Sequence, residues 1–151
     1  MTLREKIDAD LKDAMRARDQ VRVDTVRNIK SAIKYKEVEG GEAKTIDEPA
    51  ILKIIQNLIK QRKDSAEQFR TGNRPEMAEK EEREAVLLQV YLPQQLAVEE
   101  VEQIVVAAIA EAGATTAKDM GAVMKIAQAK IAGRAEGRVV SDLVKKKLSG
   151  G

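Results

Sequence analysis

Apolar residues recur at helical spacing through almost the whole chain. Leu3, Ile7 and Leu11 are four positions apart near the start, and Ile29 and Ile33 continue the same spacing further on. An apolar residue every three or four positions gives an α-helix one apolar face, whereas a half-buried strand requires strict alternation. No stretch shows a strand pattern, and only 2% of the residues are aromatic, which also disfavours a β-sandwich. The chain is therefore predicted to be all-α and packed through aliphatic side chains.

Capping residues, glycines and prolines divide this pattern into about four N-terminal helices and three shorter C-terminal ones. The segment from Ile51 to Ile59 is the most apolar and is predicted to lie at the centre of the N-terminal core. Pro93 closes the fourth helix, and a new helical pattern opens soon after it. We therefore expect an N-terminal helical domain over residues 1–93 and a basic three-helix domain over residues 94–151.

The three aromatic residues lie on or near apolar stripes. They are Tyr35, Phe69 and Tyr91. Aromatic side chains bury large areas and usually belong to the core, so all three are predicted to be buried.

Missing residue types exclude most catalytic chemistry. The chain has no cysteine and no histidine, so a thiol nucleophile, a Ser-His-Asp triad and a Cys/His zinc site are ruled out. Glu76, Glu79 and Glu82 share a helical spacing, but acidic first turns usually only complement the helix dipole. We expect no metal and no cofactor. The charged start and the lack of an apolar run near about 18 residues predict a cytoplasmic protein with no membrane contact.

The formal net charge of +2 hides an uneven distribution. Residues 97–112 hold four glutamates and no basic residue, whereas residues 118–148 hold eight Lys/Arg against three Asp/Glu. A second basic cluster on the first two helices comprises Lys12, Arg16, Arg18, Arg22, Arg27, Lys30, Lys34 and Lys36. Such clusters are often no more than solvated faces. If they bind nucleic acid, the scarcity of aromatics disfavours base stacking and favours a folded, double-helical RNA.

Several separate motifs occur in an order that resembles the GatB/YqeY family over essentially the whole chain. They are Ile59–Ala66, Gly72–Pro75, Glu81 with Glu84, Tyr91–Gln95, Asp119–Met124, Gly133–Gly137 and Val140–Ser141. The resemblance implies a larger helical domain followed by a small three-helix domain. It also implies kinship with the tail domain of the GatB subunit of the tRNA-dependent amidotransferase, which helps to hold tRNA.

The resemblance names tRNA as the expected partner, together with an aminoacyl-tRNA synthetase or an amidotransferase. Stand-alone members often carry the label carbon-nitrogen ligase with glutamine as amido donor, but the catalytic sites of the amidotransferase lie in other domains. No catalytic residue can be named in this chain. The candidate RNA contacts are the cations in and after the C-terminal motif: Lys118, Lys125, Lys130, Arg134, Arg138, Lys145 and Lys146.

Two details of the C-terminal motif lead to structural expectations. Ala97 stands where the family usually has a Ser or Thr helix cap, which should cost about 1 kcal/mol at that helix end. Gly121, Gly133 and Gly137 are assigned to close packing and turns, where a Cβ would clash or force strain.

Three functional hypotheses follow from these observations. The leading one is a non-catalytic tRNA-binding accessory protein. The second is an interaction module that docks on a synthetase or amidotransferase without RNA contact, through the polar residues 61–64 and 72–74. An amide-transfer enzyme is disfavoured, because no nucleophile, base or nucleotide site can be named.

Overall fold

The computed structural model describes residues 1–149 and divides the chain into two compact units, Met1–Leu92 and a second unit that starts at Pro93. The described residues form seven α-helices and one short 3-10 helix, with no strand among them. The all-α prediction is confirmed. None of the helices in this part of the chain is both long and apolar enough to cross a bilayer.

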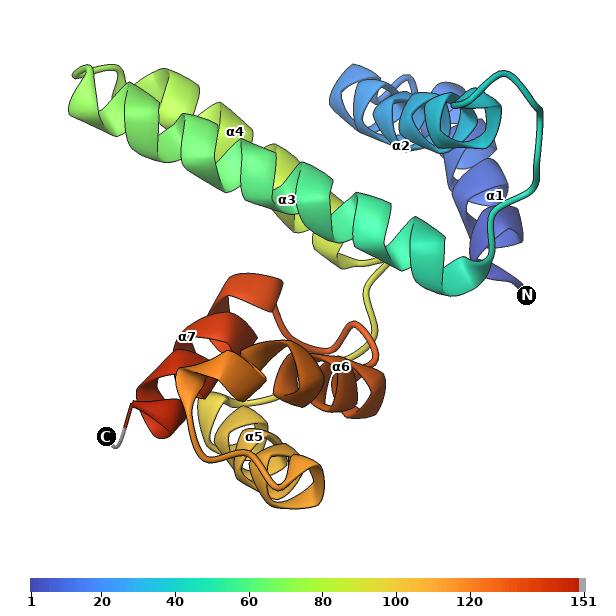
Figure 1. Cartoon of the computed structure of the whole chain (residues 1–151). Coiled ribbons are helices and arrows are strands. Elements are labelled where there is room, and N and C mark those ends of the chain that lie inside the picture. The colour runs from blue at the N-terminus through green and yellow to red at the C-terminus, as the bar shows by residue number, and fades with distance from the viewer. Residues whose placement is uncertain (150–151) are drawn as a thin grey trace. The chain divides into compact units, whose positions relative to one another are not determined.

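The N-terminal unit consists of four helices (Figure 1), namely α1 (Leu3–Arg16), α2 (Gln20–Val38), α3 (Glu48–Thr71) and α4 (Pro75–Gln89). Side-chain caps fix where these helices begin. The Thr2 hydroxyl accepts a hydrogen bond from the Glu5 amide at 3.1 Å, and the Asp47 carboxylate accepts one from the Ala50 amide at 3.0 Å. Each cap satisfies an amide that the first helical turn leaves without a partner.

Helix α3 supplies the centre of this unit's core. Ile51, Ile55 and Ile59 are almost fully buried, as the apolar run predicted. The other buried members of the cluster come from α1, α2, α4 and the residues after α4: Leu3, Ile7, Val26, Ile29, Ile33, Ala85, Leu88 and Tyr91.

Helices α3 and α4 form a hairpin whose far end extends beyond α1 and α2 (Figure 1). Ala66 and Ala78 are buried in this end, and their small side chains allow the two helices to approach closely. Arg62 of α3 lies between Glu81 and Glu84 of α4, with its Nη1 at 3.2 Å from one carboxylate oxygen of each. Small buried side chains and ion pairs therefore hold α3 and α4 together in this part of the hairpin.

The C-terminal unit contains α5 (Val98–Ala112), the 3-10 helix η1 (Ala117–Asp119), α6 (Met120–Ile131) and α7 (Gly137–Leu148). Its own core is formed by Val101, Val105, Ala108, Val123, Ala127, Ile131, Ala135, Val140 and Val144. Helix α5 begins at Ala97, which provides no side-chain cap. Of the two hydrogen bonds of a capping box, only the second is present: the Ala97 amide donates to a Glu100 carboxylate oxygen at 3.1 Å.

The three aromatic residues have different environments. Tyr91 is 6% exposed, as predicted, and Phe69 is half-buried. The prediction for Tyr35 was wrong, because this side chain is 70% exposed. Tyr35 comes two residues after the buried Ile33, and two helical residues rotate the side chain by roughly 200°, to the far side of α2.

The glycine assignments are partly confirmed. Gly133 has a φ of +82°, which a turn residue without a Cβ adopts at little cost. Close packing at Gly121 was wrong, because a Cβ there would meet no atom within 4 Å. At Gly137 a Cβ would meet only Gln128, at the ordinary contact distance of 3.9 Å.

Candidate nucleic-acid interface

The acidic helix α5 neutralises part of the basic surface in the C-terminal unit. Lys130 of α6 pairs with Glu111 at 2.8 Å, and Lys147 of α7 pairs with Glu102 at 2.7 Å. The hydrogen bond and the positive charge of Lys147 hold the pKa of Glu102 below its usual value. Of the sequence candidates, Lys130 is therefore engaged within the fold. Lys147, which is not among those candidates, is engaged in the same way.

Arg134 has a positioning role in the connection between the start of this unit and α7. Its Nε donates to the carbonyl oxygen of Gln94 at 3.0 Å, and its own carbonyl accepts from the Leu96 amide at 2.7 Å. The side chain is half-buried. These contacts hold residues 94–96 against the turn that precedes α7, so Arg134 contributes to the shape of the unit as well as to its charge.

The other five candidate cations are exposed, and within residues 1–149 their side chains form no ion pair and no hydrogen bond. They are Lys118, Lys125, Arg138, Lys145 and Lys146. We call these five residues the unpaired set.

The members of the unpaired set come from three elements. A seven-residue spacing would place Lys118 and Lys125 on one face of a single helix, but Lys118 lies in η1 and Lys125 in α6. Arg138 and Lys145 are seven residues apart within α7 and do share a face, together with the exposed Asp142. Lys146 adds a further cation beside them.

Asp119 orders the loop that carries Lys118. Its Oδ2 accepts from the amides of Thr115 at 3.0 Å and Thr116 at 3.3 Å. These two hydrogen bonds stabilise the carboxylate and lower the pKa of Asp119. The Thr116 hydroxyl in turn accepts from the Lys118 amide at 3.3 Å. Thr116 and Asp119 thus form a capping box, and this box starts η1 rather than α6.

Half of the second basic cluster, on α1 and α2, is also paired. The ion pairs are Arg22 with Asp10, Lys30 with Asp8, Lys36 with Glu39 and Arg16 with Asp13. No side-chain partner within residues 1–149 is present for Lys12, Arg18, Arg27 and Lys34.

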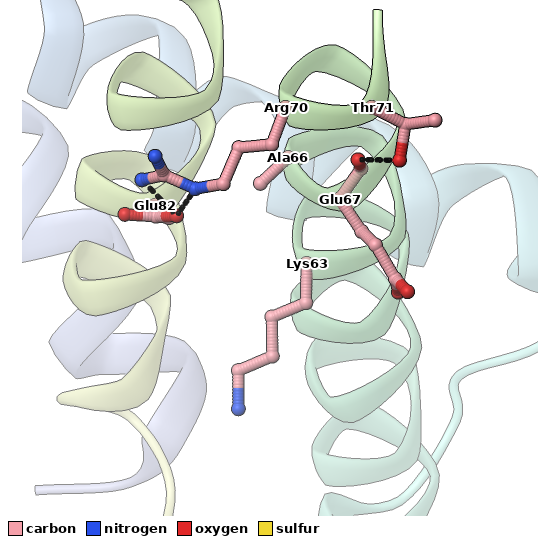
Figure 2. A pocket seen from close by; sticks show the side chains of 6 residues that line it. All are labelled: Lys63, Ala66, Glu67, Arg70, Thr71 and Glu82. Atoms are coloured by element: carbon pink, nitrogen blue, oxygen red, sulfur yellow. Dashed lines mark hydrogen bonds and ion pairs between the residues drawn. The ribbon is translucent and has the colours of Figure 1, made fainter. Parts of the chain in front are cut away.

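A shallow, open pocket of about 340 Å³ lies along the α3–α4 hairpin. Figure 2 shows Arg70 of α3 reaching across to Glu82 of α4, where two guanidinium nitrogens contact one carboxylate oxygen. The full lining is Lys63, Ala66, Glu67, Arg70, Thr71 and Glu82. The positive and negative side chains are balanced, and Glu82 is already paired. Among the described residues, no three acidic side chains are grouped in a way that could hold a metal ion.

The pairs made by Arg62 and Arg70 were not found from the sequence. They depend on how far α3 and α4 are shifted along each other, which single-helix periodicity does not report. Arg62 also belongs to the polar residues 61–64 of the docking hypothesis. Its guanidinium is occupied by Glu81 and Glu84.

Comparison with known proteins identifies the family. A family model described as "Yqey-like protein" matches residues 4–148. The chain belongs to the YqeY-like family. Curated relatives include proteins of Vanderwaltozyma polyspora, with 45% identity over 83 residues, and Lachancea thermotolerans, with 44% identity over 85 residues. A protein of Saccharomyces cerevisiae is 38% identical over 85 residues. Each is named "Altered inheritance of mitochondria protein 41, mitochondrial".

These matches cover 55–56% of this YqeY-like chain and 44–45% of each relative, so the chain spans less than half of the length of the curated relatives it matches. The names of the relatives assign them to mitochondria. This finding contradicts the cytoplasmic location that we expected from the sequence. The expectation rested on a charged start and on the lack of a long apolar run, and neither feature distinguishes one aqueous compartment from another.

Proposed function

We propose that this YqeY-like protein is a non-catalytic tRNA-binding accessory protein that serves an aminoacyl-tRNA synthetase or an amidotransferase. Its C-terminal unit contacts the phosphate backbone of the folded tRNA. One observation carries the proposal: the acidic residues of α5 pair with Lys130 and Lys147, while the five cations of the unpaired set stay exposed and available.

The composition of this surface favours contact with phosphates over contact with bases. Residues 93–149 include no aromatic side chain on which a base could stack. Lysine and arginine neutralise phosphates and release condensed counterions, which makes the affinity fall steeply with salt. If all five cations of the unpaired set contact phosphates, log K should fall with log salt at a slope of about −3.5 to −4.5, depending on whether the bound RNA is single- or double-stranded.

The test is binding of the purified protein to total tRNA and to a length-matched RNA duplex across a salt series. The expected result is tighter binding to tRNA with a salt slope of about −3 to −5. Equal and weak binding to the two RNAs would instead indicate generic charge attraction, and the proposal would be abandoned for the docking hypothesis, in which a partner enzyme binds the protein directly.

Paired variants locate the contact. The double variant Lys125→Gln and Arg138→Gln removes two cations of the unpaired set and should reduce the magnitude of the slope by up to about 2. The control Lys53→Gln with Lys80→Gln makes the same change in net charge at exposed positions of the N-terminal unit and should leave the slope unchanged. Arg134 is left intact, because its loss would free residues 94–96.

The converse experiment strengthens binding by removing acids. Glu102→Gln with Glu111→Gln releases Lys147 and Lys130 from their ion pairs. The variant should bind tRNA more tightly. The magnitude of its salt slope should increase by up to about 2. Unchanged binding in both double variants, with far-ultraviolet circular dichroism like that of the wild type, would move the RNA contact away from this unit.

A further inference from the structure

One face of α2 carries an exposed aromatic ring. Tyr35 is 70% exposed, and the phenol ring contributes nothing to the core. Asn28, Ser31 and Tyr35 follow each other at spacings of three and four residues, so they share one face of the helix. All three are exposed, and the partly exposed Val38 continues the same line.

Two cations border this line of residues. Arg27 and Lys34 are seven residues apart, and they therefore project from the same side of the helix, about 10 Å apart along its axis. Both are exposed, and neither side chain has an ion pair or a hydrogen bond with residues 1–149. The neighbouring Lys30 differs, because it turns toward α1 and pairs with Asp8 at 2.8 Å.

We propose that this face of α2 binds an unpaired nucleotide of an RNA. The ring of Tyr35 stacks on the base, Arg27 and Lys34 contact the flanking phosphates, and Asn28 and Ser31 offer hydrogen-bonding groups beside the base. The inference rests on the proposed function only in taking RNA as the ligand, and it adds a second kind of contact, to an exposed base, that the unpaired set does not make.

The residue types favour an RNA over a protein partner. Protein-binding surfaces concentrate aromatic residues, methionine and arginine at their centre and are depleted in lysine there. The ring of Tyr35 is instead bordered by a lysine, with a hydroxyl one turn away and an amide two turns away. An exposed ring among cations is the arrangement that single-stranded RNA readers use, because every base has a face that can stack. The scarcity of aromatic residues disfavoured base stacking in the sequence, but one exposed ring is enough to stack on one base, and Tyr35 is 70% exposed.

Intrinsic fluorescence can report on this site without a label. The chain has no tryptophan and only two tyrosines. Tyr91 is buried, and its hydroxyl donates to an Asp10 carboxylate oxygen at 2.6 Å, a contact that quenches phenol emission. Most of the emission therefore comes from Tyr35. Titration with a ten-nucleotide single-stranded oligoadenylate should quench it, whereas a blunt RNA duplex of the same length should not.

Two substitutions at one position separate stacking from hydrophobic contact. Tyr35→Leu keeps apolar bulk but removes the ring, and it should weaken oligoadenylate binding about 5- to 150-fold. Tyr35→Phe keeps the ring and should bind within about twofold of the wild type. The variant Arg27→Gln with Lys34→Gln should reduce the magnitude of the salt slope for the oligonucleotide by up to about 1.4, the value for two single-strand phosphates.

The outcomes distinguish this proposal from the function proposed above. Equal binding by Tyr35→Leu and Tyr35→Phe, with no quenching by oligoadenylate, would overturn the nucleotide site and make this face a candidate protein contact instead. In that case tRNA binding that still responds to Lys125→Gln with Arg138→Gln would leave the proposed function intact. The converse result is also possible. If oligoadenylate binding requires the ring of Tyr35 but the protein does not prefer tRNA over a duplex, the α2 site is supported and the tRNA function is refuted.

Discussion

Replacing Arg62 with methionine should selectively destabilise the N-terminal unit. The guanidinium Nη1 lies 3.2 Å from a carboxylate oxygen of Glu81 and at the same distance from one of Glu84. Methionine keeps most of the aliphatic stem but removes the charge and the donors. The variant leaves two carboxylates on α4 facing the place where the cation was.

The expected loss of stability follows from the burial of the three side chains and from the number of contacts that Arg62 makes. The three side chains are 28%, 16% and 14% exposed, so they are shielded more than a surface ion pair. Each charge-assisted contact contributes about 1.5 kcal/mol at the low end of its range, and partial access of water reduces the total to about 2 kcal/mol. For a unit of this size, that loss lowers the melting temperature by about 8–16 °C.

The assay must read the N-terminal unit alone. Tyr35, Phe69 and Tyr91 all lie in that unit, and the described part of the C-terminal unit has no aromatic residue. Near-ultraviolet circular dichroism during urea unfolding therefore follows the N-terminal unit, while the far-ultraviolet signal follows both. The variant should shift the near-ultraviolet transition to lower urea.

A compensating variant tests the cause. Arg62→Met combined with Glu81→Gln and Glu84→Gln removes the unpaired carboxylates and should recover a large part of the lost stability. A single variant within about 0.5 kcal/mol of the wild type would show that the three residues behave as an ordinary surface group and would refute the reasoning. The same conclusion would follow if the triple variant were no more stable than Arg62→Met.

Three further substitutions have expected effects on stability. Tyr91→Phe removes the hydrogen bond to Asp10 and should cost about 1 kcal/mol in urea unfolding near pH 7. Burial and Asp10 raise the pKa of Tyr91 above its usual 10.0, so the wild type should lose this advantage above pH 10, where only the unfolded chain releases the proton. Ala97→Ser supplies the missing cap of α5 and should stabilise the C-terminal unit by about 0.5–1 kcal/mol, seen as slower amide exchange in α5. Gly121→Ala should raise thermal stability by about 0.5–1 kcal/mol, whereas a decrease would restore the close-packing interpretation.

The helices could be predicted because their signals are local. The apolar spacing of Ile51, Ile55 and Ile59 needs only the geometry of one helix, and all three side chains are buried. Caps are equally local, because Thr2 and Glu5 need only be three residues apart to bond to each other's backbone. Such features require no knowledge of what lies across the core.

Burial at the edge of a stripe is harder to predict from the sequence. Tyr35 and Tyr91 both follow apolar residues closely, yet one is 70% exposed and the other 6%. Tyr91 lies beyond the end of α4, where its ring meets the Lys6 ammonium at 5.3 Å and its hydroxyl meets Asp10 of α1. Tyr35 comes two residues after the buried Ile33 of α2, and within residues 1–149 its ring contacts no comparable partner from another helix. Residue type alone favoured burial for both.

The sequence predicted the candidate interface only as a set of lysines and arginines. The fold shows which of these cations are paired with acidic residues and which are not. Lys130 and Lys145 looked equivalent in the sequence, but only Lys130 faces a glutamate of α5. The same division occurs on α2, where Lys30 is paired with an aspartate of α1 and Lys34 is not. In both units an acidic residue on a packed neighbour neutralises the cation nearest to it, and the cations on the outer side keep their charge. Under the proposed function, net charge therefore predicts little about the affinity for RNA. The positions of the acidic residues decide which lysines and arginines stay without an ion pair. If the proposal is right, removing two glutamates from α5 should change RNA binding as much as removing two cations from the unpaired set, with the opposite sign.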